Sequence, residues 1–110
     1  MEFNNKNGKW SISLDQPIYN YFATKNNAYT IILTETVFNF HKDNGVIFCI
    51  DMLSRRIAWK KNAKTNLGDK NTYVGIKYID NSKFYAWDSN GFREIVDTAS
   101  GEIISSDFFK

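Results

Sequence analysis

A short phrase that occurs twice constrains the fold of this chain of 110 residues more than any other feature. It reads NGVIFCID from Asn44 to Asp51 and NGFREIVD from Asn90 to Asp97, so its two glycines lie 46 positions apart. Each copy leads through a short polar turn into another run rich in β-branched or aromatic residues. An Asn-Gly pair between such runs is the strongest local signal for a β-hairpin. The sequence therefore predicts two similar β-meanders, one for each copy of the phrase.

The composition of the remaining chain also indicates a mainly β, antiparallel fold. Aromatic residues make up 16% of the sequence, and they recur with Ile and Thr in short runs that are typical of strands. The runs are separated by Asn, Asp, Ser and Gly, which favour turns. The nine runs that we expect to be strands are Trp10–Leu14, Tyr29–Thr34, Val37–His41, Val46–Asp51, Ile57–Lys61, Tyr73–Ile79, Phe84–Trp87, Phe92–Asp97 and Glu102–Ser105.

We expect a single β domain over residues 1–110, with an internal repeat at 29–61 and 75–107. Each copy of the repeat would form a three-stranded unit. A chain of this length can bury a core without a disulfide or a metal ion. The two units could pack as a sandwich or as a partly open barrel, and the sequence does not decide between them.

The best candidate for a helix is a short segment near the N-terminus, LDQPIYNYFATKNN, residues 14–27. Asp15 would cap this helix and Pro17 would fit its first turn. The run from Tyr19 to Phe22 also reads as a strand. We therefore expect at most one short N-terminal helix.

The length of each Asn-Gly turn decides which side chains share a face of the sheet. In the first copy, a three-residue loop over 43–45 with Gly45 in the left-handed conformation sorts apolar from polar residues best. That register gathers on one face Phe38, Phe40, Val46, Phe48 and Ile50.

In the second copy the turn length stays open. The same register would put Asp88 and Glu94 among the apolar residues, whereas a two-residue turn would pair Asp88 with Arg93. In either case apolar or aromatic residues remain on both faces. Such a sheet is covered on both sides or uses one side for binding.

No motif for catalysis, a cofactor or a metal ion is recognisable, so we expect a protein that is not an enzyme. There is no phosphate-binding loop, no Cys-x-x-Cys and no Gly-x-Ser-x-Gly elbow. Cys49 and His41 are the only residues of their types, and one histidine does not build the usual zinc site. Asp51 and Asp97 could in principle form a carboxylate pair for glycoside hydrolysis. Main-chain hydrogen bonding within their turns explains both more simply.

Charge gives a weak case for nucleic-acid binding. The formal net charge is +2, and a nucleic-acid-binding domain usually carries a denser basic stripe. The segment 54–66 surrounds Trp59 with basic residues, as in proteins that stack an aromatic ring on a base. A basic edge strand that prevents sheet-to-sheet aggregation, or a contact with an acidic protein, explains the same cluster and is preferred.

The N-terminal sequence MEFNNKNGKW has no apolar core of the kind found in signal peptides. No apolar run approaches the ~20 residues that span a bilayer. We therefore expect a cytoplasmic protein with no membrane partner, in which the single thiol stays reduced.

The segment NGVIFCIDMLSRRIAW resembles the strand pair of a quinoprotein-type β-propeller blade. Asn44-Gly45, Asp51 and Trp59 match the blade pattern, and Arg55 stands where the pattern has glycine. The second copy keeps the glycines and Asp97 but lacks the tryptophan. A closed propeller needs about four or more blades, and the chain is too short for them.

The C-terminal segment FYAWDSNGFREIVDTASGEIISSDFFK, Phe84 to Lys110, is similar to the ends of small bacterial immunity proteins. These proteins belong to polymorphic or contact-dependent growth inhibition toxin systems. The resemblance implies a cytoplasmic protein that binds a cognate toxin domain and neutralises it, and it carries over no catalytic residue.

A binding role directs attention to aromatic and basic residues on strands. Because the chain is close to neutral, we expect its interface to use local charge pairs and aromatic rings, or its partner not to be strongly basic. The residues that we predict to contact the partner are Arg55, Arg56, Trp59, Lys60, Lys61, Tyr85, Trp87 and Arg93. The oligomeric state is not predicted.

Overall fold

The computed structural model describes residues 1–5, 8–14, 16–36, 45–64 and 71–108, and throughout these residues it is all β with no helix. The strands are β1 (Glu2–Asn5), β2 (Gly8–Ser11), β3 (Ile18–Ala23), β4 (Tyr29–Thr34), β5 (Ile47–Asp51), β6 (Arg56–Lys61), β7 (Tyr73–Tyr78), β8 (Lys83–Asp88), β9 (Phe92–Asp97) and β10 (Ile103–Phe108).

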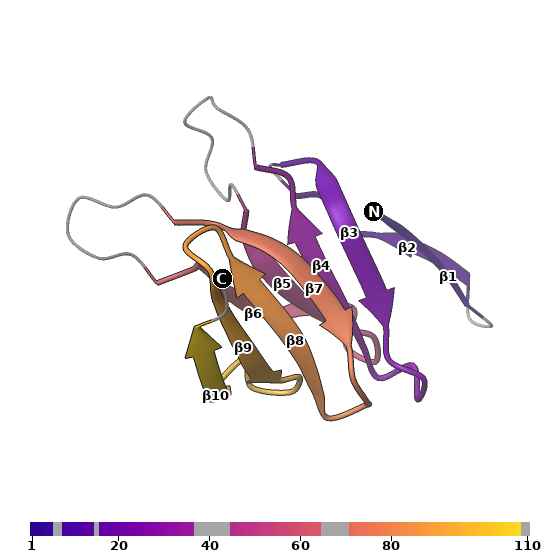
Figure 1. The fold of residues 1–110 in the computed structure, drawn as a ribbon. Coiled ribbons are helices and arrows are strands. Elements are labelled where there is room, and N and C mark those ends of the chain that lie inside the picture. The colour runs from indigo at the N-terminus through magenta and orange to yellow at the C-terminus, as the bar shows by residue number, and fades with distance from the viewer. Residues whose placement is uncertain (6–7, 15, 37–44, 65–70, 109–110) are drawn as a thin grey trace.

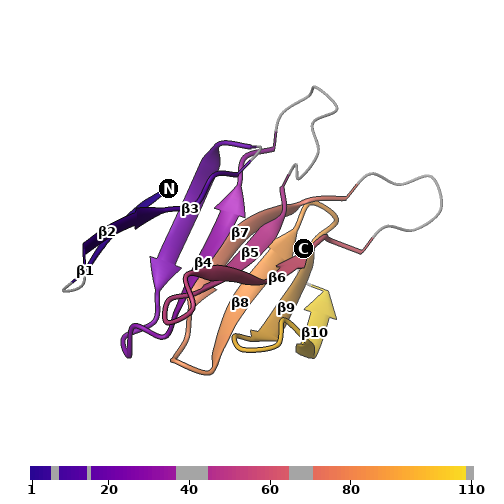
Figure 2. The same cartoon turned by 180° about the vertical axis from the view of Figure 1, so that it is seen from behind.

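The strands form two four-stranded antiparallel sheets and one separate hairpin. In each sheet the strands follow chain order, β3-β4-β5-β6 in the first sheet and β7-β8-β9-β10 in the second. Figures 1 and 2 show the second sheet facing the first across a shared core, with the β1–β2 hairpin on the far side of the first sheet. The predicted antiparallel meander is confirmed, and its two units pack as an open sandwich rather than a closed barrel. Each unit has four strands where the sequence predicted three, because β3 and β7 add an edge strand to the respective sheets.

The predicted helix over residues 14–27 is wrong. Its centre is the edge strand β3, which pairs with β4 so that Phe22 lies opposite Ile31. The ring of Phe22 packs edge-on against Phe84 of the second sheet, with centroids 5.8 Å apart. Pro17 precedes the strand and offers only its carbonyl, which accepts a hydrogen bond from the Glu35 amide at 2.8 Å. Pairing and burial in a sheet therefore override the local capping signal.

The main core lies between the two sheets. Its buried residues are Ile31, Leu33, Ile47, Cys49, Ala63, Tyr73, Ile76, Phe84, Ala86 and Val96. They come from the central strands β4, β5, β8 and β9, from β7, and from the segment after β6. Fully burying a large side chain of this kind contributes about 1.5–3 kcal/mol, so this layer is the main source of stability.

A second core lies on the opposite face of the first sheet, beneath the β1–β2 hairpin. Phe3 stacks on Trp10 with ring centroids 4.1 Å apart. Both rings belong to the cluster that covers Ile32, Phe48 and Ile50. The first sheet is therefore buried on both faces, which is why NGVIFCID is almost entirely apolar.

The second copy of the phrase alternates because only one face of its sheet is covered. In β9, Glu94 and Val96 are buried, while Arg93 and Ile95 on the other face are half-buried. Figure 1 shows no described element over that outer face. The two copies therefore differ because a hairpin covers the outer face of the first sheet, whereas no described element covers the outer face of the second.

The turn of the second copy takes the three-residue register. Phe84 lies opposite Val96, and Asp88 carries the turn because its Oδ1 accepts hydrogen bonds from the amides of Asn90 and Phe92, each at 3.0 Å. Gly91 has a positive φ of 93°, which glycine adopts without strain. The sequence does not decide this register, because it does not show which groups donate hydrogen bonds to a buried carboxylate.

The hairpin predicted for the first copy, Val37–His41 joined to Val46–Asp51 by a three-residue loop over 43–45, is wrong. The Thr34 amide donates to the Val46 carbonyl at 3.0 Å, so Val46 lies opposite Thr34 at the end of β4. Residues 37–44 themselves lie outside the described residues. Gly45 has the predicted left-handed φ, at 58°. Both neighbours of β5 are accounted for by β4 and β6, so the strand that precedes β5 in the meander is Tyr29–Thr34. The predicted grouping of Val46, Phe48 and Ile50 on one face is confirmed, since all three belong to the core beneath the hairpin.

The repeat is clearest in the turns after β5 and β9. Asp51 accepts hydrogen bonds from the amides of Leu53 and Ser54, and Asp97 accepts them from the amide and hydroxyl of Ser100. Arg55 and Gly101, which lie 46 positions apart, both have positive φ, 59° and 76°. The two aspartates therefore act as turn residues, as the simpler interpretation predicts.

Each of the four edge strands carries a β-bulge. The extra residues, read from the shifts in pairing register, are Tyr19 in β3, Ala58 in β6, Val74 in β7 and Ile104 in β10. A bulge twists an edge away from regular pairing and redirects a side chain. These bulges discourage open-ended sheet association, and two of them shape the pocket described below.

Candidate functional site

The uncovered face of the second sheet gathers three of the predicted contact residues. In the register of β8 and β9, Trp87 lies opposite Arg93 and Tyr85 lies opposite Ile95. Asp107 of β10 lies opposite Arg93 on its other side. We call these five residues the outer patch. Adjacent strands thus place aromatic, aliphatic and charged side chains on one surface that no described element covers.

Arg93 organises the outer patch. Its guanidinium makes a two-point contact with the Asp107 carboxylate, at 2.9 Å from the terminal nitrogen and 3.3 Å from Nε. The hydrogen bonds that Arg93 donates to the Asp107 carboxylate raise the pKa of Arg93. The same guanidinium lies 5.3 Å from the centre of the Tyr85 ring. A fixed charge pair beside an aromatic ring is the kind of interface feature expected for a near-neutral binding protein.

Trp87 lies flat over a glycine of the neighbouring strand. A Cβ atom built on Gly75 of β7 would lie 2.1 Å from the Trp87 indole. The indole therefore occupies the space that any other side chain at position 75 would fill. Trp87 is half-buried and held in place by the backbone beneath it, so it presents a preordered aromatic surface.

The other predicted contact residues lie on or beside β6, at an edge of the first sheet. Trp59 points into the sandwich, where it stacks near Phe84 at a centroid distance of 6.2 Å. Its indole nitrogen donates a hydrogen bond to the Thr98 carbonyl at 2.9 Å. Trp59 is therefore half-buried against the main core, and its ring is engaged there instead of being presented outward to a nucleic-acid base.

Two basic side chains of this edge also cover aromatic rings. Arg55 lies 5.7 Å from the centre of the Trp10 ring and Lys60 lies 5.9 Å from that of Phe48. Both rings belong to the core beneath the β1–β2 hairpin. The structure thus divides the eight predicted contact residues into two groups that belong to different sheets.

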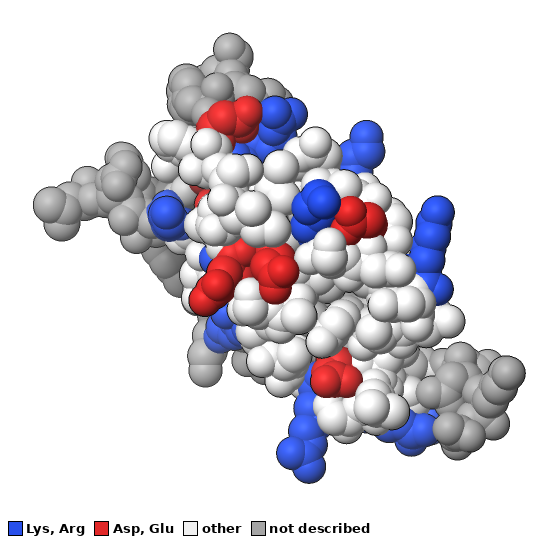
Figure 3. Space-filling model, turned by 90° about the horizontal axis from the view of Figure 1, so that it is seen from below, with Lys and Arg blue, Asp and Glu red and all other residues white. Residues whose placement is uncertain are grey.

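The β7–β8 turn lies at one end of the molecule. At that end, the charged side chains of the described residues do not form a continuous basic band. Figure 3 shows Lys and Arg scattered there among Asp, Glu and uncharged residues of the described part. Of the basic residues on and beside β6, Arg56 is exposed and Lys61 is half-buried. The footprint expected of a nucleic-acid-binding surface is a dense one, and this end does not carry it.

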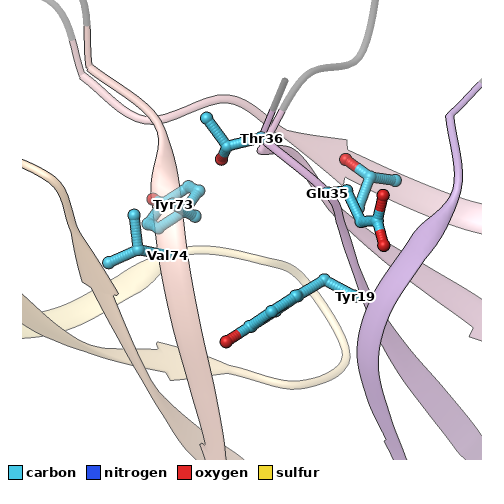
Figure 4. Close-up of a pocket in the computed structure, with 6 residues that line it drawn as sticks. Tyr19, Glu35, Thr36, Tyr73 and Val74 are labelled. Atoms are coloured by element: carbon cyan, nitrogen blue, oxygen red, sulfur yellow. The ribbon is translucent and has the colours of Figure 1, made fainter. Parts of the chain in front are cut away.

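A pocket of about 400 Å³ opens between the edge strands β3 and β7. It is lined by Tyr19, Thr34, Glu35, Thr36, Tyr73 and Val74. Figure 4 shows Tyr19 reaching from β3 across the opening, with Glu35 above it and Val74 on the opposite side. We call this the β3–β7 pocket. The sequence did not point to it, because Tyr19 lies in the segment interpreted as a helix and Glu35 matches no motif.

A smaller polar pocket of about 160 Å³ lies at the edge of the main core. Its two carboxylates, Asp88 and Glu94, are 6% and 4% exposed. Asp88 accepts a hydrogen bond from the Asn71 amide at 2.9 Å, and Glu94 accepts one from the Tyr73 hydroxyl at 2.6 Å. These hydrogen bonds compensate for burying two carboxylates at the edge of the core. Both carboxylates therefore have a structural role in the fold.

The remaining candidates for chemistry are accounted for as follows. His41 lies outside the described residues. Cys49 is fully buried, and burial, with a smaller contribution from Asp51, raises the pKa of its thiol to about 12. A thiol in that state is a poor nucleophile. Among the described residues, no group of three or more His, Cys, Asp or Glu side chains is arranged to hold a metal ion.

No helix in the described ranges is long and apolar enough to cross a bilayer. Comparisons with protein-family models, with curated proteins and with solved structures found no match to this chain.

Proposed function

We propose that this protein is an immunity protein, which binds a cognate toxin domain and neutralises it by covering its active site. The observation that carries the proposal is the outer patch. No described element covers one face of the second sheet, while the equivalent face of the first sheet is closed by a hairpin. A sheet face that keeps ordered aromatic rings without a covering layer fits a binding surface.

The chemistry of the outer patch supports a protein partner. Trp87 and Tyr85 supply flat aromatic area, and Arg93 and Asp107 supply a charge pair that is already oriented. Tyrosine, tryptophan and arginine are the residue types enriched at energetically dominant interface positions. The resemblance of the segment from Phe84 to Lys110 to bacterial immunity proteins covers all of these residues and suggests a toxin domain as the partner.

The proposal is tested by protection of cells. The chain is produced in bacteria that carry the toxin domain encoded beside its gene, and survival is measured with and without the chain. We expect the wild type to protect. Arg93→Glu, which reverses the charge facing Asp107 and removes the contact with Tyr85, should lower protection by at least about tenfold, as for an interface anchor that contributes 1.4 kcal/mol or more.

Lys25→Glu is the matched control, because it makes the same charge change on an exposed residue of the β3–β4 turn, in the other sheet and outside the predicted contact residues. It should protect as well as the wild type. Both variants are first checked for folding by circular dichroism. The proposal fails if no toxin gene adjoins this gene, if the wild type gives no protection, or if the two variants lose protection equally.

Nucleic-acid binding by the segment 54–66 is the less favoured alternative function. Titration with a single-stranded oligonucleotide at two salt concentrations tests it, because phosphate contacts make affinity fall steeply as salt rises. The burial of Trp59 beside Phe84 leads us to expect no such binding.

A further inference from the structure

The β3–β7 pocket is built by two β-bulges that face each other. Tyr19 is the extra residue of the bulge in β3 and Val74 that of the bulge in β7. Lower in the sandwich the same two strands approach, and the rings of Phe22 and Tyr78 meet edge-on at 5.5 Å. Along this edge, β3 and β7 therefore separate at the bulges. Bulges recur beside functional sites because they redirect side chains.

Tyr19 leaves much of its ring in solvent. It is 63% exposed, and Figure 4 shows its hydroxyl pointing across the opening toward β7. No hydrogen bond of the hydroxyl is found among the described residues. An aromatic ring that is redirected by a bulge and held at the mouth of a pocket offers a flat surface to an incoming group.

Glu35 provides the charge of the pocket. It is the only acidic or basic residue among the described residues that line it. The backbone of Glu35 is fixed, since its amide donates to the Pro17 carbonyl at 2.8 Å and its carbonyl accepts from Gly45 at 3.2 Å. Its carboxylate has no ion pair or hydrogen bond within the part of the chain that the structure describes. A carboxylate on a fixed backbone, beside an exposed ring, is complementary to a cation.

We propose that the β3–β7 pocket binds an arginine side chain presented by the protein partner. The planar guanidinium would lie against the Tyr19 ring and donate two hydrogen bonds to the Glu35 carboxylate. Arginine combines stacking with two-point donation to a carboxylate, which lysine does not. The hydroxyl of Thr36, on the pocket wall, is a further acceptor. This inference rests on the proposed function only in taking the arginine from the toxin domain.

The test needs no toxin, so it can fail independently of the cell-protection experiment. The full-length, isotope-labelled chain is titrated with N-acetyl-arginine amide and its amide resonances are followed by NMR. Saturable shifts are expected near Tyr19, Glu35 and Val74, with a Kd on the order of 1 mM for a single side-chain contact. N-acetyl-citrulline amide, which has the same shape without the charge, should bind at least about tenfold more weakly.

Four variants assign the binding to the two proposed residues. Glu35→Gln and Tyr19→Ala should each weaken binding of the arginine amide by about fivefold or more. Tyr21→Ala removes another exposed tyrosine of the same strand, and Glu102→Gln neutralises an exposed glutamate elsewhere. These two controls should bind as the wild type does. The inference is overturned if arginine and citrulline amides bind equally, if the shifts map elsewhere, if saturable binding is absent, or if Glu35→Gln behaves as the controls do.

Discussion

Replacing Tyr73 by phenylalanine isolates one buried hydrogen bond. Tyr73 is 1% exposed and its hydroxyl donates to Glu94 at 2.6 Å. Glu94 is 4% exposed, and this hydroxyl is its only side-chain partner among the described residues. Phenylalanine keeps the ring and its packing but leaves the carboxylate without a donor.

The expected loss follows from the charge and burial of the acceptor. A hydrogen bond to a charged group contributes about 1.5–3 kcal/mol, and an unsatisfied buried charge costs more than a neutral group. We therefore expect Tyr73→Phe to lower the free energy of unfolding by about 2–3 kcal/mol. For a domain of this size about 4 °C of Tm corresponds to 1 kcal/mol, so the Tm should fall by roughly 8–12 °C.

Urea unfolding followed by tryptophan fluorescence measures this loss, provided that the slope with urea is unchanged. Tyr78→Phe is the matched control, because its hydroxyl donates to Asn81 at 3.0 Å in an exposed turn. That variant should change stability by no more than about 0.5 kcal/mol. Equal losses in the two variants would refute the role assigned to Glu94.

A double-mutant cycle separates the bond from the charge. Glu94→Gln keeps an acceptor for Tyr73 but removes the charge. In the Tyr73→Phe background the same change removes an unsatisfied buried carboxylate, so it should cost less than in the wild type, or stabilise. We expect a coupling energy of about 1 kcal/mol or more between the two residues, and additive effects would contradict the pairing.

Two further predictions concern the core. Gly101→Ala should lower the free energy of unfolding by about 1–3 kcal/mol, because the φ of Gly101 is 76° and a Cβ would lie 2.7 Å from the Trp59 ring. Gly8 also has a positive φ, 114°, but a Cβ there would meet nothing within 4 Å. Gly8→Ala should therefore lower the free energy of unfolding by less in the same urea assay. Burial raises the pKa of Cys49 from 9.0 to about 12, so between these pH values the unfolded chain releases a proton that the folded chain keeps. Stability should therefore fall with rising pH by up to about 1.4 kcal/mol per unit from this group, and Cys49→Ala should reduce the measured slope by that amount; an unchanged slope would contradict the burial of the thiol.

The sequence predicted the β class and most strands because those features are local. Phe92–Asp97 and Tyr29–Thr34 were predicted with the bounds that the structure has, since turn residues flank a short run of strand formers. The segment around Ile18–Ala23 was misread as a helix because its capping residues are also local, and nothing in them reports the pairing with β4.

The candidate site was predicted only in part. Tyr85, Trp87 and Arg93 lie together as their alternation along β8 and β9 requires. Trp59 was predicted to contact the partner, but it packs against Phe84 between the sheets, because the local pattern does not show which way a tryptophan on an edge strand faces. Tyr19 and Glu35 come together only through two bulges and the packing of one sheet on the other.

By itself, the sequence determined that this chain forms antiparallel strands turned at glycines, because alternation and turn chemistry act over a few residues. Only the tertiary structure decided which faces are covered. The β1–β2 hairpin closes the outer face of the first sheet, whereas buried hydrogen bonds to Asp88 and Glu94 fix the register that turns Trp87 and Arg93 outward on the second. The covering of the first sheet and the register of the second depend on contacts between residues far apart in the chain, and the short-range sequence pattern does not predict those contacts.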